Sequence, residues 1–242
     1  MQAITTRELL NFWERNLNNT MIQRALDLLC CASPEMKPEV IAVLNIGERD
    51  ARLMILREWL FGSKFLNRSQ CPVCSEQIEW ETDINDIRMQ WPKNDVAPGK
   101  YLLKKDGYSI RFRMPDSNDL AAVIADAKPE KLFEKIVFDC KFRSKTFAIN
   151  QLPEKILEAI DNRIEEENPQ ADIIMNVRCP NCSHQWEMQF DIVSYLWDEI
   201  NSWARRILQD IDSIAQAYGW SEQDILNMSP ARRQIYSDIV NS

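Results

Sequence analysis

The stretches Cys71-Pro72-Val73-Cys74 and Cys179-Pro180-Asn181-Cys182 decide how this sequence is expected to fold. Each is a Cys-x-x-Cys pair, and together they supply four thiolates, the ligand number of a closed tetrahedral zinc site. Such a site leaves no position for water, so the metal would be structural and would contribute to folding. Redox dithiols or buried free thiols are the alternatives, although a redox pair normally opens a helix within a βαβ pattern. We predict one structural Zn2+ per chain, bound by Cys71, Cys74, Cys179 and Cys182.

The residues next to both pairs alternate apolar and polar side chains, as strands do. Residues 75–81 follow the first pair, whereas residues 172–178 and 183–190 flank the second. This pattern predicts a zinc ribbon that is split into two knuckles, each leading into a strand. The two pairs are separated by 104 residues, which is far longer than a ribbon loop. We therefore expect a folded module between them.

Composition limits the class of protein. The chain has 242 residues, 45% of them hydrophobic, and a formal net charge of −8 with a pI of about 4.9. This balance argues against a nucleic-acid-binding protein and against docking on an anionic membrane.

No apolar run approaches the ~20 residues of a membrane-spanning helix, and residues 1–8 lack the pattern of a signal peptide. The three remaining cysteines form no disulfide framework, so we expect a reducing cytoplasm; they are Cys30, Cys31 and Cys140.

Most of the chain outside the ribbon is expected to be helical. Residues 5–62 predict four helices, and a loop at 91–99 with two prolines and a glycine predicts a boundary. In the inserted module, Lys105-Asp106-Gly107 predicts a hairpin, followed by helices at about 116–127, 129–139 and 153–167. Residues 193–218 predict one long helix whose apolar stripe has coiled-coil-like spacing, covered either by the N-terminal bundle or by a partner. The stripe consists of Leu196, Ile200, Trp203, Ile207, Ile211, Ile214 and Tyr218.

These patterns predict a mostly helical α+β protein. The expected segments are an N-terminal helical bundle (1–65), the first half of the zinc ribbon (66–91), an inserted hairpin with helices (92–172), the second half of the ribbon (173–192) and C-terminal helices with a short helical tail (193–242).

We expect no enzymatic activity and predict no catalytic residues. The sequence has no His-Glu-x-x-His, no Gly-rich phosphate loop and no Gly-x-Ser-x-Gly pattern. Its single histidine, His184, lies in the second knuckle, where we expect a solvated side chain or a hydrogen-bond donor to a thiolate. A metal-dependent hydrolase would need an open coordination position, which four cysteines deny.

Several further segments, taken in their order along the chain, carry a resemblance to a known family. They are Gly47-Glu48-Arg49-Asp50-Ala51, Met114-Pro115-Asp116-Ser117-Asn118-Asp119-Leu120-Ala121, Asn168-Pro169-Gln170-Ala171, Leu196-Trp197-Asp198-Glu199-Ile200 and Tyr218-Gly219-Trp220-Ser221-Glu222, besides the two knuckles. Together they resemble the baseplate hub and hub-assembly-chaperone family of T-even-like phages. The resemblance covers nearly the whole chain. Family members usually have glycine where this chain has Ser75 and Ser183, and aspartate where it has Asn168.

The resemblance implies a role in building the baseplate of a phage-tail-like contractile injection system. The partners would be baseplate hub and spike proteins, met in the bacterial cytoplasm or in the particle baseplate, within a larger complex. An alternative from the residues alone is a zinc-ribbon adaptor that binds nucleic acid or transcription machinery, which the net charge of −8 disfavours.

Two sets of side chains are candidates for partner contact, since Trp and Arg are frequent at binding hot spots. The charged set around residue 50 is by default a solvated helix face, and Trp220 is alternatively a core residue at a helix corner. The candidates are Arg49, Asp50, Arg57, Glu58, Trp220, Arg232 and Arg233.

Overall fold

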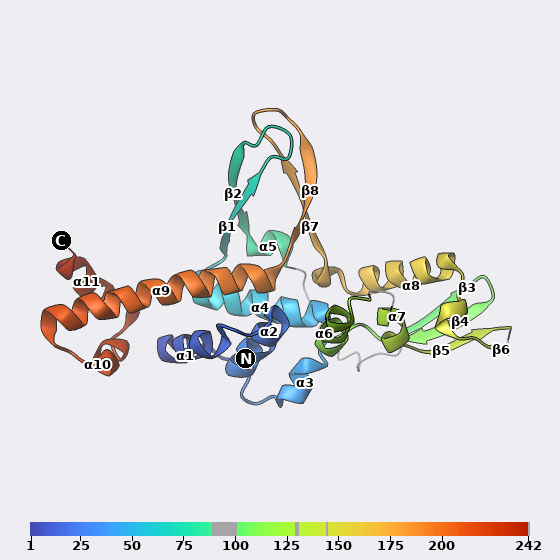
Figure 1. Cartoon of the computed structure of the whole chain (residues 1–242), viewed down its shortest axis with the longest axis horizontal. Helices are drawn as coiled ribbons and strands as arrows, with labels where there is room; N and C mark the ends of the chain where they lie inside the picture. Colours follow the sequence, from blue (N-terminus) through green and yellow to red (C-terminus); the bar gives the residue numbers. More distant parts are fainter. Residues whose placement is uncertain (89–100, 129–130, 144, 242) are drawn as a thin grey trace. The chain divides into compact units, whose positions relative to one another are not determined.

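The computed structural model describes residues 1–88, 101–128, 131–143 and 145–241, in which helices predominate (Figure 1). The chain divides into two compact units. We call Met1–Pro34 with Val193–Ser242 the helical unit, and Glu35–Ile192 the ribbon unit. The structure confirms a mostly helical α+β protein. The predicted boundary loop at 91–99 lies outside the described residues.

The helical unit contains α1 (Thr6–Asn16), α2 (Met21–Ala32), α9 (Ile192–Tyr218), α10 (Glu222–Leu226) and α11 (Pro230–Val240). Their starts follow from local capping, because Thr5, Thr20, Ser221 and Ser229 each accept a hydrogen bond from a backbone N–H of the first turn. In this unit, the first two of the four predicted N-terminal helices group with the C-terminal helices.

The apolar stripe of α9 is covered by this chain. Near its start, the ring of Trp197 packs edge-on to Phe12, with ring centroids 6.3 Å apart, and the Arg24 guanidinium lies 3.8 Å from the centroid of the Trp197 ring. Toward its end, Ile207, Ile211 and Ile214 are buried in a cluster with α10 and α11. The stripe was expected to be covered either by this chain or by a partner. The structure shows that this chain covers it, with α1 and α2 near the start of α9 and α10 and α11 toward its end.

The ribbon unit begins with α3 (Pro38–Ala42) and α4 (Ile46–Phe61). Asn45 caps α4 by accepting a hydrogen bond from Glu48 N, and Gly62 ends it with a φ of 91°. Two antiparallel hairpins follow in this unit, β1 (Lys64–Gln70) with β2 (Gln77–Asp83) and β7 (Ile173–Arg178) with β8 (Gln185–Phe190).

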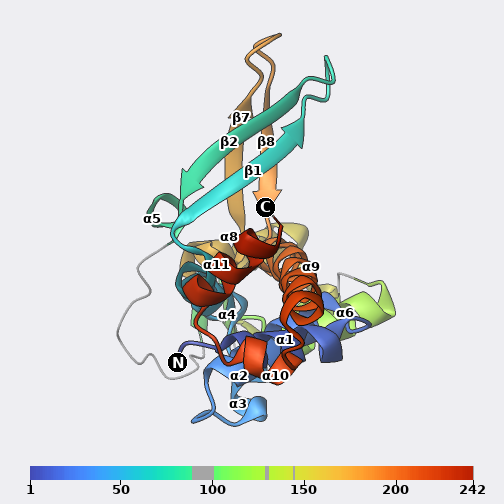
Figure 2. The ribbon, with the colours of Figure 1, turned by 90° about the vertical axis from the view of Figure 1, so that its left-hand side faces the viewer.

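The two hairpins lie side by side, and each carries a knuckle at its turn (Figure 2). Phe65 of β1 and Phe190 of β8 pack edge to face, with ring centroids 5.3 Å apart. The sequence predicted a strand after the first knuckle but none before it, so β1 is an addition to the predicted ribbon. The short helix α5 (Ile84–Ile87) follows β2.

The inserted module contains a four-stranded antiparallel sheet in the order β3 (Tyr101–Lys105), β4 (Tyr108–Phe112), β5 (Val137–Phe142) and β6 (Lys145–Thr146). Asp106 and Gly107 join β3 to β4 with φ angles of 51° and 84°, as the predicted Asp-Gly hairpin turn requires. The remaining elements are α6 (Ser117–Asp126), α7 (Lys131–Ile136), η1 (Ile149–Gln151), α8 (Glu154–Glu167) and η2 (Pro169–Ala171).

One predicted helix is shorter than expected. The sequence predicted a helix over 129–139, but α7 ends at Ile136 and residues 137–142 form β5. Val137 and Cys140 are both buried because an irregular register at Phe138 turns them to the same face, and pairing with β4 supplies the backbone hydrogen bonds. Tertiary pairing overrides local helix preference here. Pro129, expected at the helix start, lies outside the described residues.

Candidate metal centre

The two knuckles bring four thiols to one point. The sulfur atoms of Cys71, Cys74, Cys179 and Cys182 all lie within 4.8 Å of one another. Cys71 Sγ lies 3.6 Å from Cys182 Sγ, and Cys74 Sγ lies 3.5 Å from Cys179 Sγ. In a tetrahedral site with Zn–S bonds of about 2.3 Å, neighbouring sulfurs would be about 3.8 Å apart. The four free thiols therefore have the number and spacing that a tetrahedral metal ion needs.

The backbone of each knuckle folds in the same way. Cys71 N donates to Glu76 O at 2.9 Å and Ser75 N donates to Cys71 O at 2.9 Å. In the second knuckle, Cys179 N donates to His184 O at 2.8 Å and Ser183 N donates to Cys179 O at 3.0 Å. Because these bonds fix the turn, both cysteines of a pair face the same point.

Ser75 and Ser183 stand at the knuckle positions where the resemblance led us to expect glycine. Their φ angles are 60° and 62°, which is the left-handed region that favours glycine. The turn is therefore kept without the glycine, at a cost in backbone strain.

Protein surrounds the thiols unevenly. Cys71 and Cys179 are each 1% exposed, whereas Cys182 is exposed, and Ile78, Trp80 and Trp186 pack around the group. This apolar cover excludes water from the inner side of the cluster. A metal ion bound here would join the two hairpins through a centre that protein shields from water on one side.

The thiols differ in acidity in the absence of metal. Burial opposes ionisation of Cys71, but hydrogen bonds from the backbone N–H groups of Cys74 and Val73 lower its pKa to about 7. The backbone N–H of His184 favours a Cys182 thiolate, yet burial and the neighbouring thiols raise the pKa of Cys182 to about 12. The Cys71 thiolate is thus stabilised, whereas Cys182 keeps its proton at neutral pH. Holding all four as thiolates would require a cation among them.

The other three cysteines lie outside this cluster, and His184 belongs to the second knuckle. The His184 ring stacks on Trp186, with centroids 5.9 Å apart, so its side chain contacts an aromatic ring. Cys30 and Cys31 are half-buried in α2, and burial raises the pKa of Cys31. Cys140 is buried in β5, where burial raises its pKa as well.

Three of the four charged candidates on α4 are buried, in contrast to the solvated face that was the default expectation. Arg49, Asp50 and Arg57 are 4%, 6% and 2% exposed. Arg57 donates to the carbonyl oxygens of Gly62 and Lys64, both at 2.6 Å, and its guanidinium lies 4.1 Å from the centroid of the Phe65 ring. The side chain thereby fastens the end of α4 to the start of β1.

The buried charges leave little surface for a partner. Arg49 Nε lies 2.7 Å from Asp50 Oδ1, and burial raises the pKa of Asp50 to about 6 although Arg49 lowers it. Glu58 is half-buried and pairs with Arg88 at 2.5 Å. We therefore assign Arg49, Asp50 and Arg57 to the stability of the fold.

These residues belong to a buried polar junction that sequence reasoning did not identify. Arg49 donates to Ser117 Oγ at 3.3 Å, and Asn168 Oδ1 accepts from Gly47 N at 3.0 Å. Asn168 Nδ2 is buried and has no hydrogen-bond partner among the described residues. The sequence offered one indication of this junction, since the segments around Arg49, Ser117 and Asn168 all carry the family resemblance. That these segments converge depends on the tertiary fold and could not be read from the sequence.

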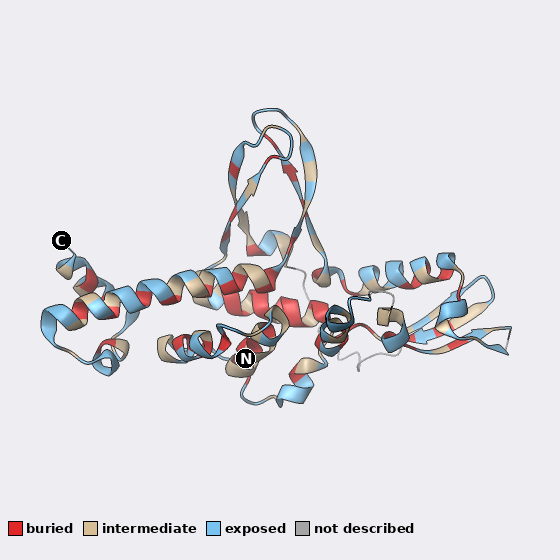
Figure 3. Ribbon diagram, in the orientation of Figure 1, coloured by how far each residue is buried: buried red, intermediate tan, exposed pale blue. Residues whose placement is uncertain are grey.

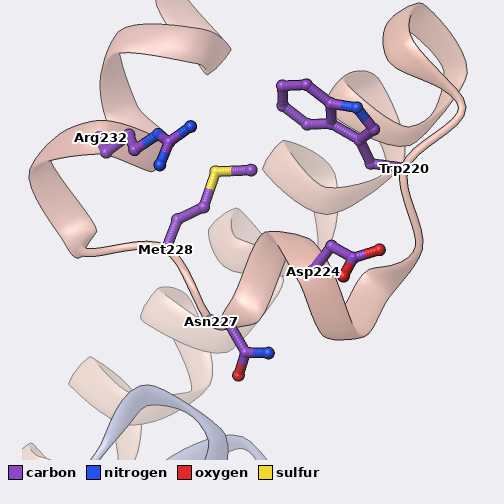
Figure 4. Close-up of a pocket in the computed structure, with 5 residues that line it drawn as sticks. All are labelled: Trp220, Asp224, Asn227, Met228 and Arg232. Carbon is purple, nitrogen blue, oxygen red and sulfur yellow. The ribbon is translucent and has the colours of Figure 1, made fainter.

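The remaining partner candidates lie in the helical unit. Trp220 is half-buried, stacked on Tyr218 at 4.7 Å and edge-on to Tyr236 at 5.0 Å. It lines a shallow pocket of about 330 Å³ in which Met228 lies between Trp220 and Arg232 (Figure 4); Asp224 and Asn227 complete the lining. Arg233 is 3% exposed and faces Asp210 of α9, so only Arg232 offers an exposed guanidinium.

A family model described as T4 bacteriophage base plate protein matches residues 7–197. The match contains both knuckles and the buried polar junction, and it ends within α9. No curated protein and no solved structure matches the chain significantly. Among the described helices, none combines the length and the apolar character that crossing a membrane requires.

Proposed function

Because the chain belongs to the T4 bacteriophage base plate protein family, we propose that it is a baseplate hub component or hub assembly chaperone of a phage-tail-like contractile injection system. The observation that carries this proposal is the family match over residues 7–197, which supports a baseplate protein. The role is non-enzymatic in this proposal. Its support is the family together with a sequence that lacks the usual catalytic patterns.

The metal in this proposal is a structural Zn2+. Four thiols spaced for tetrahedral coordination support it, because soft thiolates and this geometry suit zinc. Zn2+ held by Cys71, Cys74, Cys179 and Cys182 would supply only a rigid link between hairpins, since four protein ligands fill its coordination. The chain's own contribution is to place the thiols, exclude water and hold the inserted module between the two knuckles.

The proposed partners are the hub and spike proteins at the centre of the baseplate. Assembly would take place in the cytoplasm of the producing bacterium, and a hub component would remain in the particle whereas a chaperone would leave. Trp220 and Arg232, which line the pocket of the helical unit, remain our candidates for partner contact.

Co-expression with the hub and spike proteins of the same tail gene cluster tests this function. We expect a complex that survives size-exclusion chromatography, and mass spectrometry of purified particles then separates a resident hub subunit from a transient chaperone. As a matched pair, Arg232→Glu should weaken the complex while the exposed Arg205→Glu on α9 should not. If neither hub nor spike protein associates with the wild-type chain, the proposal is overturned.

A further inference from the structure

Among the described residues, elements of this chain cover one face of the sheet β3–β6 and leave the other face uncovered. Ile110, Phe112 and Cys140 point to the covered face, where they are buried against Ile156 and Ile160 of α8. Side chains alternate along a strand, so the residues between them lie on the opposite face. Register then places Leu102, Arg111 and Asp139 in one row across the sheet, and Lys104, Ser109 and Lys141 in the next.

This outer face is positively charged, although the chain as a whole is acidic. The register places Lys104, Arg111 and Lys141 on this face against one carboxylate, Asp139, whereas the whole chain contains 29 Lys and Arg against 37 Asp and Glu. Asp139 pairs with Lys141 at 3.1 Å, and Asp106 pairs with Lys155 at 2.7 Å. Within the part of the chain that the structure describes, Lys104 and Arg111 are exposed and form no ion pair.

Apolar surface adjoins the charges. Leu102, directly opposite Arg111, is 50% exposed, and Phe138 at the irregular register of β5 is 49% exposed. Exposed large apolar side chains beside arginine are typical of protein interfaces. In Figure 3 the ribbon of β3–β5 carries exposed residues interspersed with buried ones, as the alternation of the two faces requires.

We infer that the outer face of the sheet, formed by Leu102, Lys104, Arg111, Phe138 and Lys141, docks an acidic segment of a partner protein. The positive face complements an acidic segment, and the rest of the chain, being acidic, orients that segment toward this face. Leu102 and Phe138 fit apolar side chains within the segment. This inference relies on the proposed function only for the class of partner, a protein.

The same charges favour a protein over nucleic acid. Duplex DNA has one negative charge per ~1.7 Å of its axis, so it needs an extended basic track. Here the basic face spans a few strands, contains Asp139 and belongs to a chain with a net charge of −8. A short acidic peptide segment can contact the basic face without approaching the acidic surface of the rest of the chain.

Binding of a fluorescent poly-glutamate peptide to the full chain tests the surface. We expect binding at low ionic strength that weakens at physiological ionic strength, because these charges are exposed. The triple variant Lys104→Glu, Arg111→Glu, Lys141→Glu should bind about tenfold more weakly or worse, because three positive charges that attract the peptide are reversed. Lys104→Gln with Arg111→Gln keeps the Lys141–Asp139 pair and should give an intermediate loss.

The matched control changes the same number of exposed charges elsewhere, with Lys37→Glu, Arg205→Glu and Arg206→Glu. Circular dichroism melting shows that each variant is folded. Equal losses in the control and the sheet variants would overturn the inference, as would tighter binding of duplex DNA that is lost in the sheet variants. A hub complex that forms equally well with the triple sheet variant would overturn this docking surface and leave the proposed function standing. Poly-glutamate binding by a wild-type chain that forms no hub complex would support the docking surface and overturn the proposed function.

Discussion

Cys74 Sγ lies 3.5 Å from Cys179 Sγ although the two residues are 105 positions apart in the chain. Closing so long a loop is costly in chain entropy, so the contact needs compensation from the packed hairpins and from any metal between them. The inserted module lies between the two residues. A metal bound by the knuckles would therefore stabilise the ends of that module as well as the ribbon.

Replacing Ser75 or Ser183 by glycine is expected to stabilise the knuckles. Both serines have positive φ angles near 60°, which glycine adopts without steric cost. The gain should be about 1 kcal/mol or less at each position, because glycine also increases the entropy of the unfolded chain. Urea unfolding of Ser75→Gly and Ser183→Gly measures it, with Ser183→Ala as a control that keeps the strain. Lower stability of both glycine variants would show that the left-handed turn is not strained.

Asn168→Asp is expected to stabilise the ribbon unit at neutral pH. The carboxylate keeps the hydrogen bond from Gly47 N, removes the buried Nδ2 that has no partner in the described structure, and places negative charge at the start of α4. We expect a gain of about 1 kcal/mol that disappears when acid protonates the carboxyl group. Asn168→Ala, which loses the acceptor for Gly47 N, should be less stable than wild type. A destabilised Asn168→Asp variant would mean that the burial of charge outweighs these gains.

Arg57 is expected to stabilise the fold and not to bind a partner. Lysine cannot reproduce the fork with which Arg57 reaches both Gly62 O and Lys64 O, so Arg57→Lys should lose about 2 kcal/mol of unfolding free energy. Glu58→Gln, next to it in sequence and only half-buried, should lose less than about 1 kcal/mol. Thermal melting checks both. An Arg57→Lys variant that is as stable as wild type but fails to bind hub proteins would restore the partner-contact role.

Asp50 is expected to make the folded state less stable as the pH rises. Burial raises its pKa in the folded state from 3.8 to about 6, against the effect of Arg49. Between these values the folded state binds more protons than the unfolded state, so Asp50 favours folding as the pH falls from 7 to 4. Relative to Asp50→Asn, the wild type should gain on the order of 3 kcal/mol across this range.

Urea unfolding of wild type and Asp50→Asn at several pH values measures the difference between their free energies of unfolding. Effects of pH that both proteins share, such as metal loss, cancel in this difference. Asp126→Asn is the control, because Asp126 is exposed and its pKa is lowered by its hydrogen bond to Lys131. A difference between wild type and Asp50→Asn that does not change with pH would contradict a raised pKa.

The features that follow local rules could be predicted from the sequence. Two Cys-x-x-Cys pairs indicated the converging thiols, the Asp106-Gly107 pair indicated a hairpin, and regular apolar spacing indicated α9. Helix starts also follow local rules, because Thr20, Ser221 and Ser229 cap the helices that begin directly after them. In each case the decisive residues are close together in the chain or repeat at a fixed interval.

The features that depend on distant segments could not be predicted. The inward face of β1 contains Asn67, which is 4% exposed and donates to Thr82 Oγ1, so the apolar alternation that signals a strand is interrupted. Arg49 and Arg57 resemble an exposed helix face until Ser117, Gly62 and Lys64 are known to lie beside them. Their burial is a property of the assembled unit.

The metal content of the purified protein tests the central claim most directly. Elemental analysis should find one zinc per wild-type chain and none in the double variant Cys71→Ser, Cys179→Ser, which should also lose the stable pairing of its hairpins. A wild-type chain that keeps its fold without metal, and whose four knuckle thiols all react with a thiol reagent, would contradict the zinc clamp.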